Sequence, residues 1–153
     1  MSQEKRLTDS ERIERVDKWL EDVSEASRRW KTAKSAQQSS ERTASYLEEI
    51  AANMVGKSEE LDGRMAVAIE RNKANAERMA QYAAEQAELE SEFYEFLKHV
   101  RPAEVAEAWR LRCIGHRTWY QCAMALHYNR QHLERLSKQA KATAYAYLPR
   151  RYR

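Results

Sequence analysis

An all-α fold is predicted by three features of this 153-residue sequence. Three Gly and two Pro leave few places for the chain to turn. Charged residues make up 33% and hydrophobic residues 42%, a balance typical of long amphipathic helices. Core-type residues recur in alternating steps of three and four from Val16 to Val100, which is a heptad repeat. We therefore expect one domain, an elongated antiparallel bundle or coiled coil of three long helices over residues 9–55, 58–100 and 102–147.

The first helix is expected to begin beside Thr8. Thr8 and Glu11 have the spacing of a capping box, in which each side chain bonds the backbone amide of the other residue. From Ala33 to Ala51 the apolar stripe contains mainly Ala, Gln and Ser. Small side chains let helices approach closely, so this stretch either packs tightly or is the least firmly held part of the core.

A turn is predicted near residues 56–60. Gly56 and Gly63 each cost a helix about 1 kcal/mol, and Ser58 is a favourable first-turn cap for a new helix. The heptad repeat nevertheless continues in phase through both glycines, which keeps an alternative open: one helix of about 90 residues with a folded-back C-terminal helix. The turn is favoured because it gives three segments of similar length, as an up-down-up bundle requires.

The second helix is acidic and carries polar residues on its buried stripe. Residues 56–100 contain ten Asp or Glu against six Lys or Arg. Asn72 and Asn75 lie on the stripe, where polar side chains commonly fix the register or the oligomeric state, so we predict a register-setting role for both. Pro102 ends this helix and is expected in the first turn of the next one.

The third helix is expected to be basic. From Arg101 to the end there are eleven Lys or Arg and three Glu. Gly115 is a predicted kink, and helical order should end at Leu148 because Pro149 follows, leaving a short basic tail.

Catalytic and metal-binding patterns are missing from the sequence. The four histidines never occur as Glu-x-x-His, the arrangement that builds di-iron sites in helical bundles, and no phosphate-binding glycine loop is present. Cys113 and Cys122 lie nine residues apart, on roughly opposite faces of a helix, so a disulfide between them is not expected. We predict no enzyme activity, cofactor or metal. No run of about 18 apolar residues occurs and the first residues lack an apolar stretch, so we expect no transmembrane or signal segment and a location in the cytoplasm or inside a particle assembled there.

Basic and aromatic side chains concentrate in the C-terminal third and are the candidate partner-binding residues. They are Arg130, Arg135, Lys138, Tyr145, Tyr147, Arg150, Arg151, Tyr152 and Arg153. Such a surface pairs either with carboxylates of a protein or with phosphates and bases of a nucleic acid. Because Pro149 ends the helix, we expect the tail to dock on an acidic surface of a neighbouring subunit, with nucleic-acid phosphates as the lesser alternative.

Two functions are compatible with these observations. The heptads favour a non-enzymatic structural or adaptor subunit that assembles through helix-helix contacts, with protein partners or with itself, into a larger complex such as a phage particle, an injection machine or a secretion machine. The alternative is a nucleic-acid-binding protein that uses the basic, aromatic C-terminal helix and tail.

Overall fold

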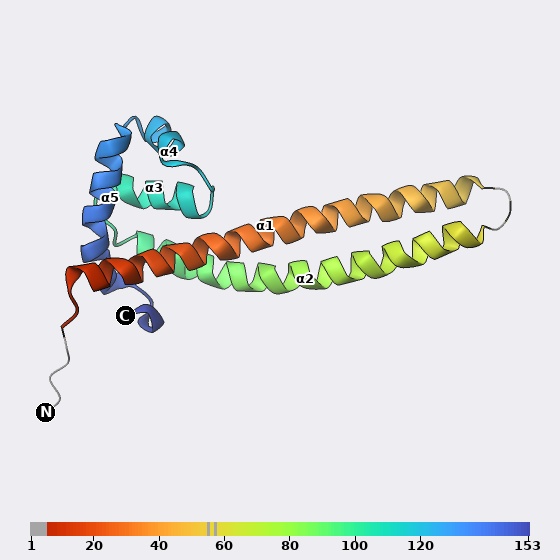
Figure 1. Cartoon of the computed structure of the whole chain (residues 1–153), viewed down its shortest axis with the longest axis horizontal. Helices are drawn as coiled ribbons and strands as arrows, with labels where there is room; N and C mark the ends of the chain where they lie inside the picture. The colour runs from red at the N-terminus through yellow and green to blue at the C-terminus, as the bar shows by residue number, and fades with distance from the viewer. Residues whose placement is uncertain (1–5, 55, 57) are drawn as a thin grey trace, which may run out of the picture. The chain divides into compact units, whose positions relative to one another are not determined.

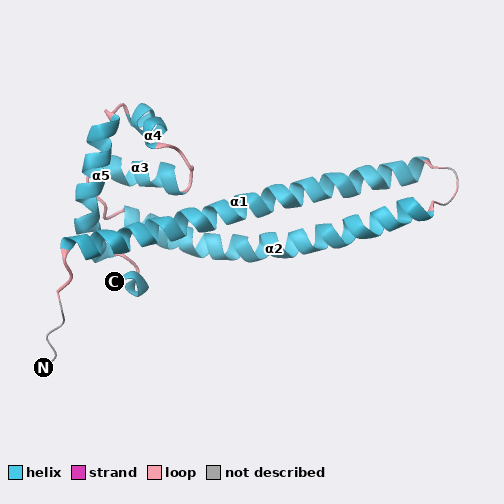
Figure 2. Cartoon of the chain, in the orientation of Figure 1, coloured by secondary structure: helices cyan, strands magenta, loops and turns pink. Residues whose placement is uncertain are grey.

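The computed structural model describes residues 6–54, 56 and 58–153, and all regular structure in that part of the chain is helical (Figures 1 and 2). The elements in chain order are α1 (Asp9–Asn53), α2 (Glu59–Leu97), α3 (Ala103–Cys113), α4 (Trp119–Leu126), α5 (Arg130–Ala144) and two short 3-10 turns, η1 (Tyr145–Tyr147) and η2 (Arg150–Tyr152). The predicted all-α class and the packing of helices into a bundle are confirmed.

Two compact units make up the chain. One, which we call the terminal unit, consists of the chain up to Ser27 together with Ala87–Arg153. The other, the hairpin unit, is Arg28–Gln86. Helices α1 and α2 each contribute residues to both units.

The hairpin unit confirms the predicted turn. Helix α1 ends at Asn53 and α2 begins at Glu59, which rules out one continuous helix through this region. Ser58 caps α2, since its Oγ accepts a hydrogen bond from the backbone N–H of Leu61 at 3.2 Å. Gly56 has φ +105°, a conformation that glycine adopts without strain, whereas Gly63 lies inside α2. Val55 and Lys57 lie outside the described residues.

Inside the hairpin unit the predicted stripe is the buried face. Its α1 residues Ala33, Gln37, Ser40 and Leu47 are buried, and so is Ala68 of α2. Hydrogen bonds from Gln37 and Ser40 of α1 to Asn72 of α2 join the two antiparallel helices. The small stripe residues therefore allow α1 and α2 to pack closely here.

The terminal unit contains the larger apolar core. Trp19, Phe93, Phe96 and Trp109 are at most 2% exposed, and Trp19 meets both phenylalanine rings edge-on at centroid distances of 6.4 and 6.3 Å. Fully burying one such side chain contributes about 2 to 3 kcal/mol. Further core residues come from α1, the end of α2 and the following helices: Val16, Val23, Val100, Val105, Ala140, Ala144 and Leu148.

The predicted capping box holds the start of α1. The backbone N–H of Glu11 donates to Thr8 Oγ1 at 3.2 Å, and the N–H of Thr8 donates to Glu11 Oε2 at the same distance. These two bonds satisfy amide donors that a helix start otherwise leaves unpaired.

The predicted single helix over 102–147 is wrong, because three helices occupy that segment. A Cβ on Gly115 would lie 2.7 Å from the Leu111 carbonyl oxygen, and the backbone N–H of Arg117 bonds that same oxygen at 3.0 Å. His116 then adopts φ +51°, outside the right-handed helical region. The predicted kink at Gly115 is thus a full helix end.

Two further breaks shape this segment. Thr118 and Gln121 form a second capping box, at 3.1 and 2.9 Å, that starts α4. His127 ends α4 with φ +58°, and Asn129 caps α5 through its side chain. At the N-terminus of α3, Pro102 is the N-cap residue and therefore precedes the first turn, in which it was expected.

Candidate nucleic-acid interface

Helices α4 and α5 are joined by a three-residue turn, residues 127–129. His127 reverses the chain in the left-handed conformation, and the Asn129 side chain accepts a hydrogen bond from the backbone N–H of His132 at 3.3 Å. The tight turn therefore sets α5 at an angle to α4 and begins it with an ordered N-terminus (Figure 1).

Helix α3 packs against both helices of this pair. A small core forms from Ala108 of α3, Cys122 and Ala123 of α4, and Leu133 of α5, all at most 4% exposed. The indole N–H of Trp109 donates to Ser137 Oγ at 2.7 Å, a buried bond that ties α3 to α5. The three helices thus form one packed group in which α5 has a fixed buried face.

The opposite face of α5 is polar and exposed. Gln131, Arg135 and Lys138 follow one another at steps of four and three residues, so their side chains lie along one face of the helix. Arg130 stands at the first position of α5 and lies 3.8 Å from Glu134, an ion pair of two solvent-exposed groups that contributes little to stability. This α5 face combines long donors with an amide side chain.

Basic groups on neighbouring segments reinforce the positive charge. The Arg112 guanidinium lies 4.6 Å from the centre of the Trp119 ring, and Arg117 is exposed in the loop between α3 and α4. Glu107 of α3 is paired with Arg110, and that hydrogen-bonded pair lowers the pKa of the Glu107 carboxyl.

The tail packs on carboxylates of its own chain. Arg151 makes two hydrogen bonds to the carboxylate of Glu92, at 2.8 and 2.9 Å, and the Tyr152 hydroxyl donates to Asp22 at 2.5 Å. The Tyr152 ring lies 5.0 Å from the Trp19 ring. Burial, and then the bond to Asp22, raise the pKa of Tyr152 to about 12. The acidic receptor expected on a neighbouring subunit is supplied for both side chains by the same chain; binding of a partner by the tail stays a prediction.

Most of the remaining candidate residues also contact their own chain. Tyr147 stacks on His99 with ring centres 4.4 Å apart, and Tyr145 lies under the Arg12 guanidinium. Arg150 is exposed, and the Arg153 guanidinium reaches the Ala146 carbonyl at 3.5 Å. The structure therefore brings Arg130, Arg135 and Lys138 together on α5, while most of the other candidates contact side chains or backbone of their own chain.

Asn72 and Asn75 lie in the hairpin unit and both contact α1. The Asn72 Oδ1 accepts hydrogen bonds from Gln37 Nε2 and Ser40 Oγ, each at 3.0 Å. Asn75 Nδ2 reaches the Ala36 carbonyl at 3.4 Å. Both asparagines therefore contact α1 across the hairpin, and their register-setting role stays a prediction.

Neither thiol has the environment of a reactive group. Burial raises the pKa of Cys113 to about 12, and burial also raises the pKa of Cys122. Both cysteines are free, and in the described part of the chain no three His, Cys, Asp or Glu side chains gather as a metal site. No described helix is long and apolar enough to cross a membrane.

The residues that sequence reasoning missed are those that build the turn. Thr118, Gln121 and Asn129 are capping residues at helix starts, and Thr118 with Gln121 has the same spacing as the recognised pair Thr8 and Glu11. This spacing predicts a helix start at Thr118, but the apolar stripe continues through the breaks and favours one long helix.

Comparison with known proteins identifies no relative: no family model, no curated protein and no solved structure matches this chain.

Proposed function

We propose that α3, α4 and α5 bind double-stranded DNA as a helix-turn-helix unit, with α5 as the recognition helix. In such units two helices joined by a turn of three or four residues pack on a further helix, and the second of the pair enters the major groove. The observation that carries the proposal is the ordered three-residue turn followed by a helix with an exposed polar face.

Side-chain chemistry on α5 supports this assignment. Arginine and lysine donate to the guanine edge in the major groove, and glutamine pairs with adenine, so Arg135, Lys138 and Gln131 are suited to reading bases. Arg130, at the helix start, is placed to meet a phosphate. From Arg101 onward eleven basic residues stand against three acidic ones, and this positive charge favours a polyanionic ligand.

The test is selection of duplex sequences from a random pool, followed by fluorescence anisotropy on the selected duplex. We expect Arg135→Ala to weaken binding by about 1 to 3 kcal/mol and to relax the sequence preference at one position. Arg130→Ala should weaken binding to all duplexes and lower the slope of log K against log salt by about one.

Arg78→Glu is the matched control, because Arg78 is an exposed residue of α2 in the hairpin unit. This variant should bind the selected duplex as the parent does. The proposal is wrong if no sequence is enriched, or if Arg135→Ala and the control behave alike while circular dichroism shows both folded.

A second function is favoured by the hairpin unit, which we propose serves helix-helix assembly in a non-enzymatic adaptor role. What supports it is the pair of large apolar side chains Tyr46 and Val67, which line the same groove and are each more than half exposed. Such side chains, when grouped on one surface, are typical of protein contact sites. Cross-linking in the native host extract, with Tyr46→Ser as the comparison, tests this role; the adaptor role is wrong if the two proteins give the same adducts.

A further inference from the structure

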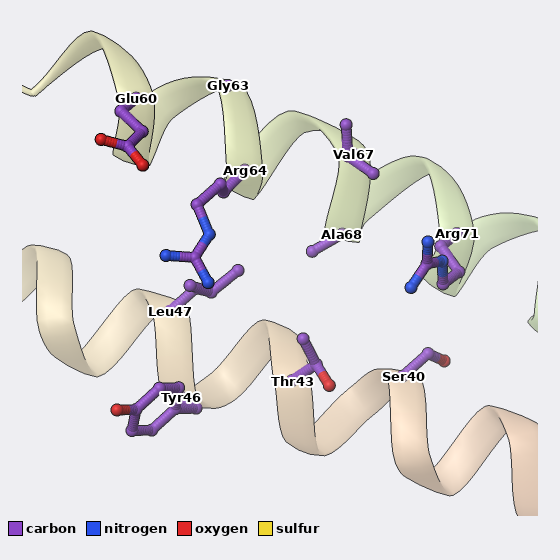
Figure 3. A pocket seen from close by; sticks show the side chains of 10 residues that line it. All are labelled: Ser40, Thr43, Tyr46, Leu47, Glu60, Gly63, Arg64, Val67, Ala68 and Arg71. Atoms are coloured by element: carbon purple, nitrogen blue, oxygen red, sulfur yellow. The ribbon is translucent and has the colours of Figure 1, made fainter.

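A groove of about 460 Å³ runs between α1 and α2 in the hairpin unit (Figure 3). Leu47 and Ala68, 5% and 8% exposed, contribute buried apolar side chains to it. Tyr46 from α1 and Val67 from α2 border it and are 63% and 59% exposed. Arg64 reaches across the groove toward Leu47. The groove thus offers an apolar surface next to charged side chains.

Gly63 borders the groove, and nothing within this chain requires a glycine at that position. It lies in the interior of α2, where glycine costs about 1 kcal/mol relative to alanine. A Cβ added there would meet nothing within 4 Å. A missing side chain on an exposed helix face allows another backbone to approach closely.

The charges along α2 are arranged so that the surface complements itself. Glu60 and Arg71 both line the groove and are eleven residues apart, which is close to three helical turns and places them on the same face. When a second α2 is laid antiparallel with its centre between residues 65 and 66, Glu60 of each copy faces Arg71 of the other. The same alignment sets Arg64 of each copy against Val67 of the other.

We propose that a second copy of this chain occupies the groove, so that two hairpin units pack antiparallel about a two-fold axis. Two-fold interfaces use the same patch on both subunits and repeat each contact twice. The Glu60–Arg71 pair and the cover of Val67 by the Arg64 side-chain stem both occur twice in this arrangement. A foreign helix would need the same charges at the same spacing to match it. The proposal names the partner for the assembly role stated above and rests on that role.

Sedimentation equilibrium of the full-length protein over a concentration series tests the proposal. The parent protein should form dimers. Glu60→Arg and Arg71→Glu should each weaken dimerisation about tenfold, because either change creates two like-charge contacts. The double variant Glu60→Arg/Arg71→Glu should restore it. Glu70→Arg and Lys73→Glu, which change exposed α2 residues that do not line the groove, are the matched controls and should dimerise as the parent does.

Gly63→Ala separates folding from association. It should raise the melting temperature of the dilute monomer, because alanine favours the helix, while weakening the dimer. A chain that stays monomeric at all concentrations, or a dimer that the charge changes leave intact, overturns the proposal. If the protein is monomeric but its cross-links to a different protein disappear in Glu60→Arg, the groove belongs to that protein; the self-association idea then fails and the adaptor role stands. If the parent protein forms neither dimers nor cross-links to another protein, both the self-association and the adaptor role are refuted.

Discussion

At the scale of single residues, Tyr152 is the contact that makes the tail part of the fold. Its ring lies against Trp19 and its hydroxyl donates to Asp22, although only three residues separate it from Leu148, the last buried residue before the tail. Aromatic contact and a hydrogen bond to a carboxylate together outweigh the cost of ordering one side chain. A short tail is thereby held without any partner.

Tyr152→Phe should reveal, through the pH dependence of stability, the raised pKa of Tyr152, which is caused first by burial and then by the bond to Asp22. The unfolded tyrosine ionises near pH 10, whereas the folded one has a pKa of about 12. Because the folded pKa is raised, the stability that the protonated Tyr152 hydroxyl contributes is fully present below pH 10 and is lost as pH rises to 12. In urea titrations the parent should lose stability over that window more steeply than the variant. At neutral pH the variant should be less stable by about 1 kcal/mol.

Cys113 also has a raised pKa, but both proteins contain it, so its effect cancels in the difference. Parallel curves for parent and variant from pH 10 to 12 would contradict the raised pKa of Tyr152.

At the scale of helices and turns, the sequence predicted what depends on local chemistry. The capping pair Thr8 and Glu11, the turn around Gly56 and the buried stripe were all readable because each follows from side chains close together in the chain. The division of 102–147 was not recognised. Apolar residues there keep a helical spacing across both breaks, since α3, α4 and α5 each bury one face in the same core, and periodicity alone does not reveal a break.

The candidate interface was predicted in part. Arg130, Arg135 and Lys138 share a helix in either description, so composition was sufficient to select them. Gln131 is a candidate only because the turn at His127 places it in the first turn of a separate helix, α5. The tail residues were selected by charge, yet charge does not say whether the carboxylate they meet lies in the same chain.

Asn72→Ala tests the polar contacts between α1 and α2. The variant loses bonds from Gln37 and Ser40 in a partly buried place and should lower the free energy of unfolding by about 1 to 2 kcal/mol in urea titrations. Asn75→Ala is the matched control on the same helix, because its single contact of 3.4 Å is long and should contribute less than about 0.5 kcal/mol. Equal losses in the two variants would mean that Asn72 has no special part in the register.

At the scale of the whole molecule, the proposed DNA binding and the proposed self-association lie in different units. The terminal unit contains α3, α4 and α5 and the proposed DNA-reading face, and the hairpin unit contains the self-complementary groove. Dimeric helix-turn-helix proteins bind paired half-sites, so association through the groove would make tight binding depend on two half-sites and on protein concentration. Helices α1 and α2 link these properties because they belong to both units.

Deleting Arg150–Arg153 distinguishes a tail that belongs to the fold from one that waits for a partner. The sequence alone predicts nearly unchanged melting, since a tail beyond Pro149 has no place in a long helix. With the contacts from Arg151 to Glu92 and from Tyr152 to Asp22 and Trp19, we instead expect a loss of about 2 to 3 kcal/mol, or about 5 to 10 °C in melting temperature by circular dichroism. Arg150→Ala, at an exposed position, should melt as the parent does. Below the lowered melting temperature, the truncated protein should still bind the selected duplex, because the proposed DNA contacts lie on α5. Unchanged melting would show that the tail contributes nothing to the fold and would favour the external receptor.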